Sequence, residues 1–127
     1  MKTKFEHLVQ TVRTLRGPEG CPWDKKQTHE SLIKCLQNES QELIQAIENK
    51  DTENMKEELG DVLLQVLMHA QIAQEEGAFN IEDVIAYLDE KLHRRHPHVF
   101  GGHAKATSPE EALAVWREMK KKEREGK

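Results

Sequence analysis

The sequence predicts an all-α protein, and three observations support this prediction. Aromatic residues make up only 5% of the 127 residues, and β-branched residues are scarce beside Glu, Lys, Gln, Leu and Ala. Apolar residues recur at helical spacing, and no segment alternates for long enough to form a strand. Hydrophobic residues make up 36% and charged residues 33%, which indicates a small core that a partner subunit would extend.

Two helices separated by a loop are expected in the first part of the chain. The first covers about residues 3–16, where apolar residues recur every three or four positions. Gly and Pro residues over 17–22 predict a loop. The second helix is expected from an N-cap at Thr28 to about Asn49. Its apolar positions are Leu32, Leu36, Leu43 and Ile47.

A very short connection, residues 50–52, follows the second helix. It allows only an antiparallel neighbour, so we expect a helix hairpin. The third helix is expected over about 53–76, with Gly77 just after its end. This helix is apolar almost all round, which implies contacts on more than one side. Its main apolar stripe consists of Met55, Leu59, Val62, Val66, Ala70 and Ala73. The apolar residues outside this stripe are Leu64, Leu67, Met68 and Ile72.

Two further helices are expected in the last third of the chain. Asn80 is the predicted N-cap of the fourth, which ends before Pro97. Residues 98–107 predict a loop that contains glycine. Ser108, followed by proline and two glutamates, predicts the start of the last helix. The basic run from Lys120 predicts a frayed end.

Composition narrows the classes of function. The net charge of −4 does not favour nucleic acid as a partner. No apolar run approaches the roughly 18 residues that a membrane span needs, and the first residues do not resemble a signal peptide. Cys21 and Cys35 do not make a disulfide framework, which fits reduced thiols in the cytoplasm. With no linker or repeat, we expect a single domain over residues 1–127.

Acidic residues stand where the helical pattern calls for apolar ones. Glu39 falls inside the apolar stripe of the second helix, about 20° from Leu32 around the helix axis, and Glu42 lies one turn further on. Glu58 and Asp61 flank the stripe of the third helix with the same i, i+3 spacing. Because the short connection folds the two helices together, the two pairs should face each other at the same height.

Four converging carboxylates predict a divalent metal site. Their charges repel and are poorly solvated between helices unless a multivalent cation neutralises them. Oxygen ligands with no Cys or His nearby favour Mg²⁺ or Mn²⁺ over zinc. The alternative is a solvated acidic helix face, which explains Glu53 and Glu57 well but Glu39 poorly.

Basic residues supply what a phosphate substrate would need. Magnesium sites of this kind usually hold phosphates, and Lys91, Arg94 and Arg95 lie on one face of the fourth helix near its end. Cations are also favoured at any helix C-terminus, which is the alternative for each of them. Trp23 could stack on a base, and Trp116 could do the same; an anchor in a core or interface is the alternative for both.

These residues lie in motifs that resemble the MazG family of all-α nucleoside triphosphate pyrophosphohydrolases. The segments that carry the resemblance are 20–24 (GCPWD), 27–28 (QT), 38–42 (NESQE), 57–61 (EELGD) and 91–100 (KLHRRHPHVF). The family pattern is E-E-x-x-E followed by E-x-x-D, and its first Glu is Asn38 here. The resemblance implies an antiparallel helix hairpin that forms a four-helix-bundle-like core, completed by dimerisation or a higher homo-oligomer such as a tetramer.

The resemblance also implies an activity, namely Mg²⁺-dependent cleavage of a nucleoside triphosphate between its α and β phosphates. Lys91 and Arg95, with Arg94, would contact the triphosphate. The residues that would hold the metal, and act by activating water through it, are Glu39, Glu42, Glu58 and Asp61. One alternative is a non-catalytic nucleotide-binding regulatory or assembly module of the same fold. A di-metal redox bundle is a weaker one, because it needs two Glu-x-x-His motifs and the sequence has one, at Glu90. The preferred base and sugar stay open.

Overall fold

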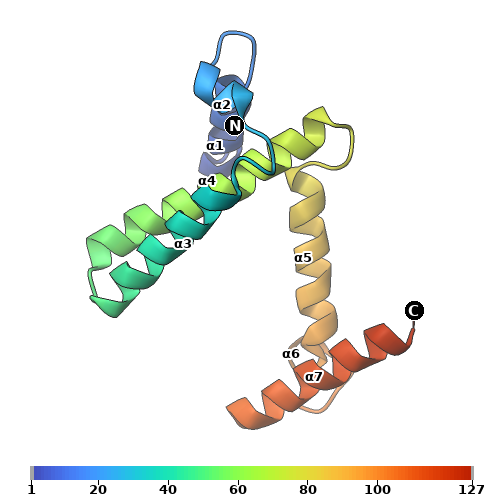
Figure 1. Cartoon of the computed structure of the whole chain (residues 1–127). Helices are drawn as coiled ribbons and strands as arrows, with labels where there is room; N and C mark the ends of the chain where they lie inside the picture. The colour runs from blue at the N-terminus through green and yellow to red at the C-terminus, as the bar shows by residue number, and fades with distance from the viewer. Residues whose placement is uncertain (1, 127) are drawn as a thin grey trace. The chain divides into compact units, whose positions relative to one another are not determined.

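The computed structural model describes residues 2–126, and all regular secondary structure in that range is helical, as the sequence predicts. The chain divides into two compact units, residues 1–81 and 82–127. The first unit contains α1 (Lys4–Leu15), α2 (Pro22–Lys26), α3 (Ile33–Glu48) and α4 (Thr52–Glu75) (Figure 1). After the first residue of α5 (Ile81–Arg95), the second unit contains the rest of that helix, α6 (Pro97–Phe100) and α7 (Pro109–Glu125).

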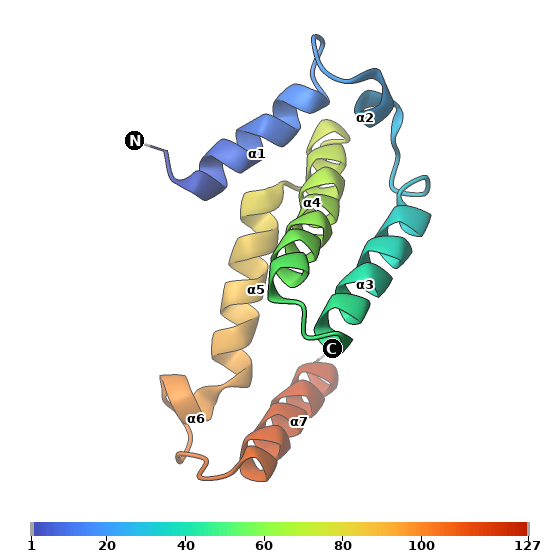
Figure 2. The same ribbon diagram turned by 90° about the vertical axis from the view of Figure 1, so that its left-hand side faces the viewer.

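The predicted hairpin is formed by α3 and α4, which lie side by side and antiparallel in both views (Figures 1 and 2). Lys50 has a positive φ of 54° just after α3. Its N–H donates to the Ile47 carbonyl, and the N–H of Asp51 donates to the Ala46 carbonyl, so α3 ends in a Schellman motif. The Asp51 side chain then accepts from Asn54 N–H and caps α4. The turn therefore reverses the chain within the three residues 49–51.

Two boundaries in the first unit differ from the prediction. Trp23 lies on a short helix, α2, which begins with Pro22 at the end of the predicted loop. The second predicted helix begins at Ile33 rather than directly after Thr28. Thr28 and Ser31 instead bond each other reciprocally, side chain to backbone N–H, and close a separate turn. His29 in that turn places its Nδ1 2.8 Å from Nδ1 of His69 on α4, a tertiary contact that holds the turn apart from α3.

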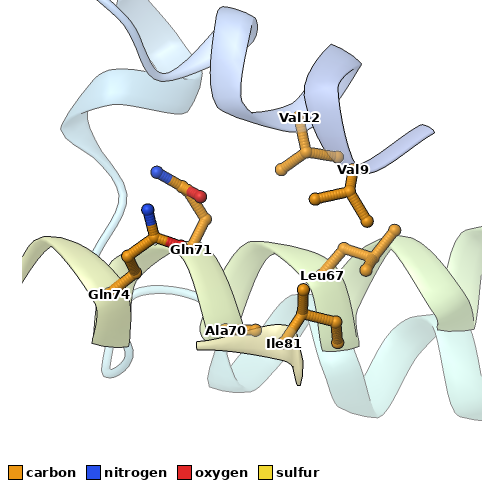
Figure 3. A pocket seen from close by; sticks show the side chains of 7 residues that line it. All are labelled: Val9, Val12, Leu67, Ala70, Gln71, Gln74 and Ile81. Carbon is orange, nitrogen blue, oxygen red and sulfur yellow. The ribbon is translucent and has the colours of Figure 1, made fainter. Parts of the chain in front are cut away.

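The core of the first unit forms around α4, which packs against both α1 and α3. Its most buried apolar side chains are Val12, Leu32, Ala46, Leu67, Met68 and Ala73. Figure 3 shows a small cavity between α1 and α4, where Val9 and Val12 face Leu67. The predicted stripes are only partly buried within the chain. Their exposed members include Leu36, Ile47, Leu59 and Val66.

The second unit departs from the prediction at two points. Residues 98–100, expected to be loop, belong to the short helix α6, which begins with Pro97. The last helix starts at the predicted cap, where the Ser108 hydroxyl accepts from Glu111 N–H. It then continues to Glu125 instead of fraying from Lys120. Within residues 2–126, none of the helices has the length and apolar composition that crossing a membrane requires.

Candidate metal centre

Four carboxylates meet across the α3–α4 hairpin. Glu39 and Glu42 come from α3, and Glu58 and Asp61 come from α4. One oxygen from each lies within 4.8 Å of the corresponding oxygen of every other. The i, i+3 spacing puts each pair on one helix face, and the short turn brings the two faces to the same height. The structure thus brings together the four acids that the sequence analysis singled out.

Burial differs among the four carboxylates. Glu58 is 7% exposed, Glu39 and Asp61 are half-buried, and Glu42 is exposed. The Oε2 atoms of Glu39 and Glu58 are both buried, and neither accepts a hydrogen bond from any residue in the range 2–126. A buried carboxylate oxygen without a donor is costly unless a cation replaces the lost solvation. Because Glu42 is the exposed member of the four, solvent reaches the cluster from its side.

The pKa values of the buried acids rise in this setting. Burial is the main cause that raises the pKa of Glu58 to about 7, and the adjacent carboxylate of Glu42 adds to it. Burial, then the charges of Glu42 and Asp61, also raises the pKa of Glu39. Among the described residues, no Lys, Arg or His forms an ion pair with any of the four. The fold gathers negative charge here without supplying a counter-charge of its own.

This donor set fits a hard divalent cation. It consists of carboxylate oxygens alone, and two of them are buried and lack a hydrogen-bond donor. Mg²⁺ and Mn²⁺ prefer such oxygen ligands. Glu53 and Glu57 differ from the cluster, because both are exposed and Glu53 pairs with Lys56 at 3.0 Å. A solvated acidic face therefore describes Glu53 and Glu57 and not the four clustered acids.

The predicted phosphate-binding residues lie in the second unit, at the end of α5. Arg95 is 8% exposed and its guanidinium lies over the Trp116 ring, 4.6 Å from the ring centre. Arg94 and Arg95 both pair with Glu123 of α7. Hydrogen bonds from both guanidinium groups lower the pKa of Glu123 to about 2. Lys91 is half-buried and has no ion-pair partner among residues 2–126.

Trp23 is 56% exposed on α2, in the first unit. Arg16, which the sequence analysis did not single out, holds this segment: its Nη1 donates to the carbonyls of Asp24 at 2.6 Å and Gln27 at 3.0 Å. The other edge of the guanidinium pairs with Glu75 near the end of α4. Glu75 is about 21 Å of helical rise from Asp61. Within this unit, the attachment of the Trp23 segment is thus remote from the acid cluster.

No local pattern could have pointed to Arg16. An arginine at the end of a helix is ordinary, and its partner Glu75 is 59 positions away in the sequence. Glu123 was missed for a related reason, because its two arginine partners lie 28 and 29 positions earlier, beyond a proline and a glycine-containing loop. Contacts between segments far apart in the sequence depend on tertiary packing, so local sequence patterns do not predict them.

Comparison with known proteins adds an independent line of observation. Residues 27–100 match the model of the MazG nucleotide pyrophosphohydrolase domain. Over 120 residues, 94% of the chain, it is 58% identical to a nucleoside triphosphate pyrophosphohydrolase/pyrophosphatase MazG of Thermotoga maritima and covers 45% of that protein. Over 122 residues, 95% of the chain, it is 43% identical to the nucleoside triphosphate pyrophosphohydrolase of Escherichia coli K12 and covers 46% of it. This chain therefore spans a little under half the length of these two curated relatives.

A solved structure resembles the whole fold. The crystal structure of a mazG-related protein from Thermotoga maritima superposes with a TM-score of 0.74 at 35% sequence identity. The match covers 91% of this chain and 98% of that one. The helical architecture described above is therefore shared over nearly the full length of both chains.

Proposed function

Since this chain belongs to the MazG nucleotide pyrophosphohydrolase family, we propose that it hydrolyses a nucleoside triphosphate between the α and β phosphates. The oxygen of a water molecule joins the α phosphorus while the bond from that phosphorus to the bridging oxygen breaks. The products are a nucleoside monophosphate and pyrophosphate. The observation that carries the proposal is the group of four carboxylates whose oxygens lie within 4.8 Å of one another.

In this proposal the carboxylates hold Mg²⁺, for which Mn²⁺ can substitute. A bound divalent ion would offset the negative charge of the phosphate oxygens and, as a Lewis acid, would lower the pKa of a water molecule. The buried Oε2 atoms of Glu39 and Glu58 provide ligands that water does not already solvate. Glu42 is the exposed member, and with half-buried Asp61 it completes the set on the side open to solvent.

The remaining roles follow the chemistry of the substrate. Lys91, Arg94 and Arg95 bind the phosphate chain and offset its negative charge. Residues 1–127 act as one functional domain of a cytoplasmic protein. The apolar side chains left exposed on α3 and α4 support a homo-oligomer, a dimer or a tetramer.

Loss of a carboxylate ligand tests the proposal. Glu42→Ala and Asp61→Ala should each lower Mg²⁺-dependent pyrophosphate release by at least about a hundredfold, because each removes a charged ligand. Glu53→Ala is the matched control, since Glu53 is exposed on the same hairpin and pairs only with Lys56 among the described residues. The assay should screen common and damaged nucleoside triphosphates, with the products identified by chromatography.

Each other outcome contradicts a named part of the proposal. A nucleoside diphosphate product would refute cleavage between the α and β phosphates. Full pyrophosphate release by Glu42→Ala or Asp61→Ala would refute the ligand assignment. Nucleotide binding without turnover across the whole panel would instead favour a non-catalytic regulatory or assembly module, for which the replacement of an acid of the family pattern by Asn38 is the supporting observation.

A further inference from the structure

Glu123 of α7 connects the two arginines at the end of α5. Nε and Nη2 of Arg95 donate to the two carboxylate oxygens of Glu123, at 2.9 and 3.0 Å, and form a bidentate ion pair. Arg94 shares the same carboxylate: its Nη2 donates to Oε1 at 3.1 Å, and its Nε lies 3.0 Å from Oε2. Arg94 also pairs with Glu90 on its own helix. A single carboxylate from α7 thus contacts both guanidinium groups.

Two contacts together determine how the Arg95 guanidinium is oriented. The indole ring of Trp116 lies against its flat face, with 4.6 Å between the guanidinium carbon and the ring centre, and this contact sets the plane of the group. The pair with Glu123 then sets the rotation within that plane, because both bonds lie along the Nε–Nη2 edge. Neither contact alone fixes both. These contacts restrict the orientation of the Arg95 guanidinium more than that of an arginine without tertiary contacts.

The same geometry leaves part of the guanidinium available. Arginine carries five N–H donors, and Glu123 uses two of them. Nη1 of Arg95 has no hydrogen-bond partner within residues 2–126, and it is not among the buried atoms that lack one. The Nη1–Nη2 edge can therefore donate two hydrogen bonds to a second oxyanion, in the bidentate geometry that suits phosphate.

We propose that Glu123 is a positioning residue, which orients Arg95 so that its Nη1–Nη2 edge binds the phosphate chain of the nucleotide. This inference rests on the proposed function. The low pKa of Glu123 supports it, since the carboxylate stays ionised at every pH at which such an enzyme would act. Glu123 itself does not touch the substrate. Its main effect on binding passes through Arg95, with which it makes two hydrogen bonds, and a smaller effect passes through Arg94.

The test is the Glu123→Gln variant, which keeps the size of the side chain but removes its charge. We expect the KM for the nucleotide and the inhibition constant of inorganic pyrophosphate to rise by about tenfold, with kcat within about twofold. Glu118→Gln is the matched control, because Glu118 lies on the same helix, is exposed and pairs only with Lys122 and His103 among the described residues. It should leave both constants unchanged.

A double-mutant cycle separates positioning from a direct effect. Arg95→Lys should raise KM, and adding Glu123→Gln to it should raise KM by less than Glu123→Gln does in the unmodified protein, because the Arg95 guanidinium is gone and only the contact of Glu123 with Arg94 remains. Effects that multiply independently would overturn the inference. A lower KM for Glu123→Gln alone would overturn it too, since that result means that the carboxylate competes with phosphate for Arg95.

NMR spectroscopy of the arginine side chain gives a readout that needs no turnover. The Nε–H signal of Arg95 should be resolved and slow to exchange in the unmodified protein, and lost in Glu123→Gln. If no nucleotide is cleaved, the proposed function fails, and titration with inorganic pyrophosphate then decides the inference separately. A shift of the Arg95 signal that Glu123→Gln abolishes supports it. No shift in the unmodified protein, or the same shift in both proteins, overturns it.

Discussion

The two units of the molecule differ in how their clustered charged side chains are paired. In the first, four carboxylates lie within 4.8 Å of one another with no cation paired to them among the described residues, and burial raises the pKa of Glu58 to about 7. In the second, two guanidinium groups share Glu123, and their hydrogen bonds lower the pKa of that carboxyl to about 2. The four carboxylates of the acid cluster repel one another, whereas the two arginines are stabilised by their ion pairs with Glu123.

This contrast indicates what each cluster is for. Gathered like charges destabilise a fold, so a cluster that the protein tolerates without compensation calls for a ligand of opposite charge. Paired charges need no such ligand, and their geometry serves to orient a group, as with Arg95 against Trp116. The acid cluster is thus a candidate binding site, whereas Glu123 is an ion-pair partner of two arginines.

The largest expected effect is the stabilisation of the folded protein by a divalent cation that binds the four carboxylates. Mg²⁺ at a hundredfold excess over its Kd should stabilise the folded protein by about 2.7 kcal/mol, since the unfolded chain does not assemble the site. For a chain of this size, that corresponds to a rise in Tm of about 10 °C. Thermal unfolding followed by circular dichroism, with and without EDTA, measures it.

Two variants sharpen this prediction. The double variant Glu39→Gln/Glu58→Gln should lose most of the Mg²⁺-dependent rise in Tm, because it removes the charges of the two acids with buried, unpartnered oxygens. Glu53→Gln should retain it. The same rise in all three proteins, or with K⁺ at matched ionic strength, would mean that general screening and not a site is responsible.

The hairpin and its acids could be predicted from the sequence because they depend on local periodicity and a short turn. Glu39 stood out as an acid within an apolar stripe, and the turn at Lys50 left only an antiparallel return. The start of α3 was wrong because a long-range contact, between His29 and His69, competes with the helix there. Glu123 was beyond prediction for the same reason, since its role depends on where α7 packs.

A smaller effect is expected from pH in the metal-free protein. The folded state keeps a proton on Glu58 up to about pH 7, whereas the unfolded chain releases it near its usual pKa of 4.5. Stability should therefore fall as pH rises from about 4.5 to about 7, and level off above that. Glu58→Gln should flatten this slope, with Glu39 accounting for what remains. Tm measured in EDTA from pH 4.5 to 8 tests it, and a Tm that rises over this range would contradict it.

The smallest effect concerns the arginine cluster, and it should have the opposite sign. Glu123 titrates near pH 2 in the folded protein and near 4.5 when unfolded. Its contribution to stability is therefore complete above about pH 4.5 and is lost as pH falls toward 2. The Tm difference between the unmodified protein and Glu123→Gln should shrink over that range. Because the carboxylate is 22% exposed, solvent screens the pair and keeps the effect small.

A ¹³C NMR titration of the Glu123 carboxyl isolates this group from the other acids. If it titrates near 4.5, the pairing with Arg94 and Arg95 does not persist in solution, and the contrast between the two units disappears. If it titrates near 2 while Glu58 titrates near 7, two carboxyls of one chain differ by about five pKa units. Such a difference arises only from their surroundings, one among carboxylates and the other between guanidinium groups.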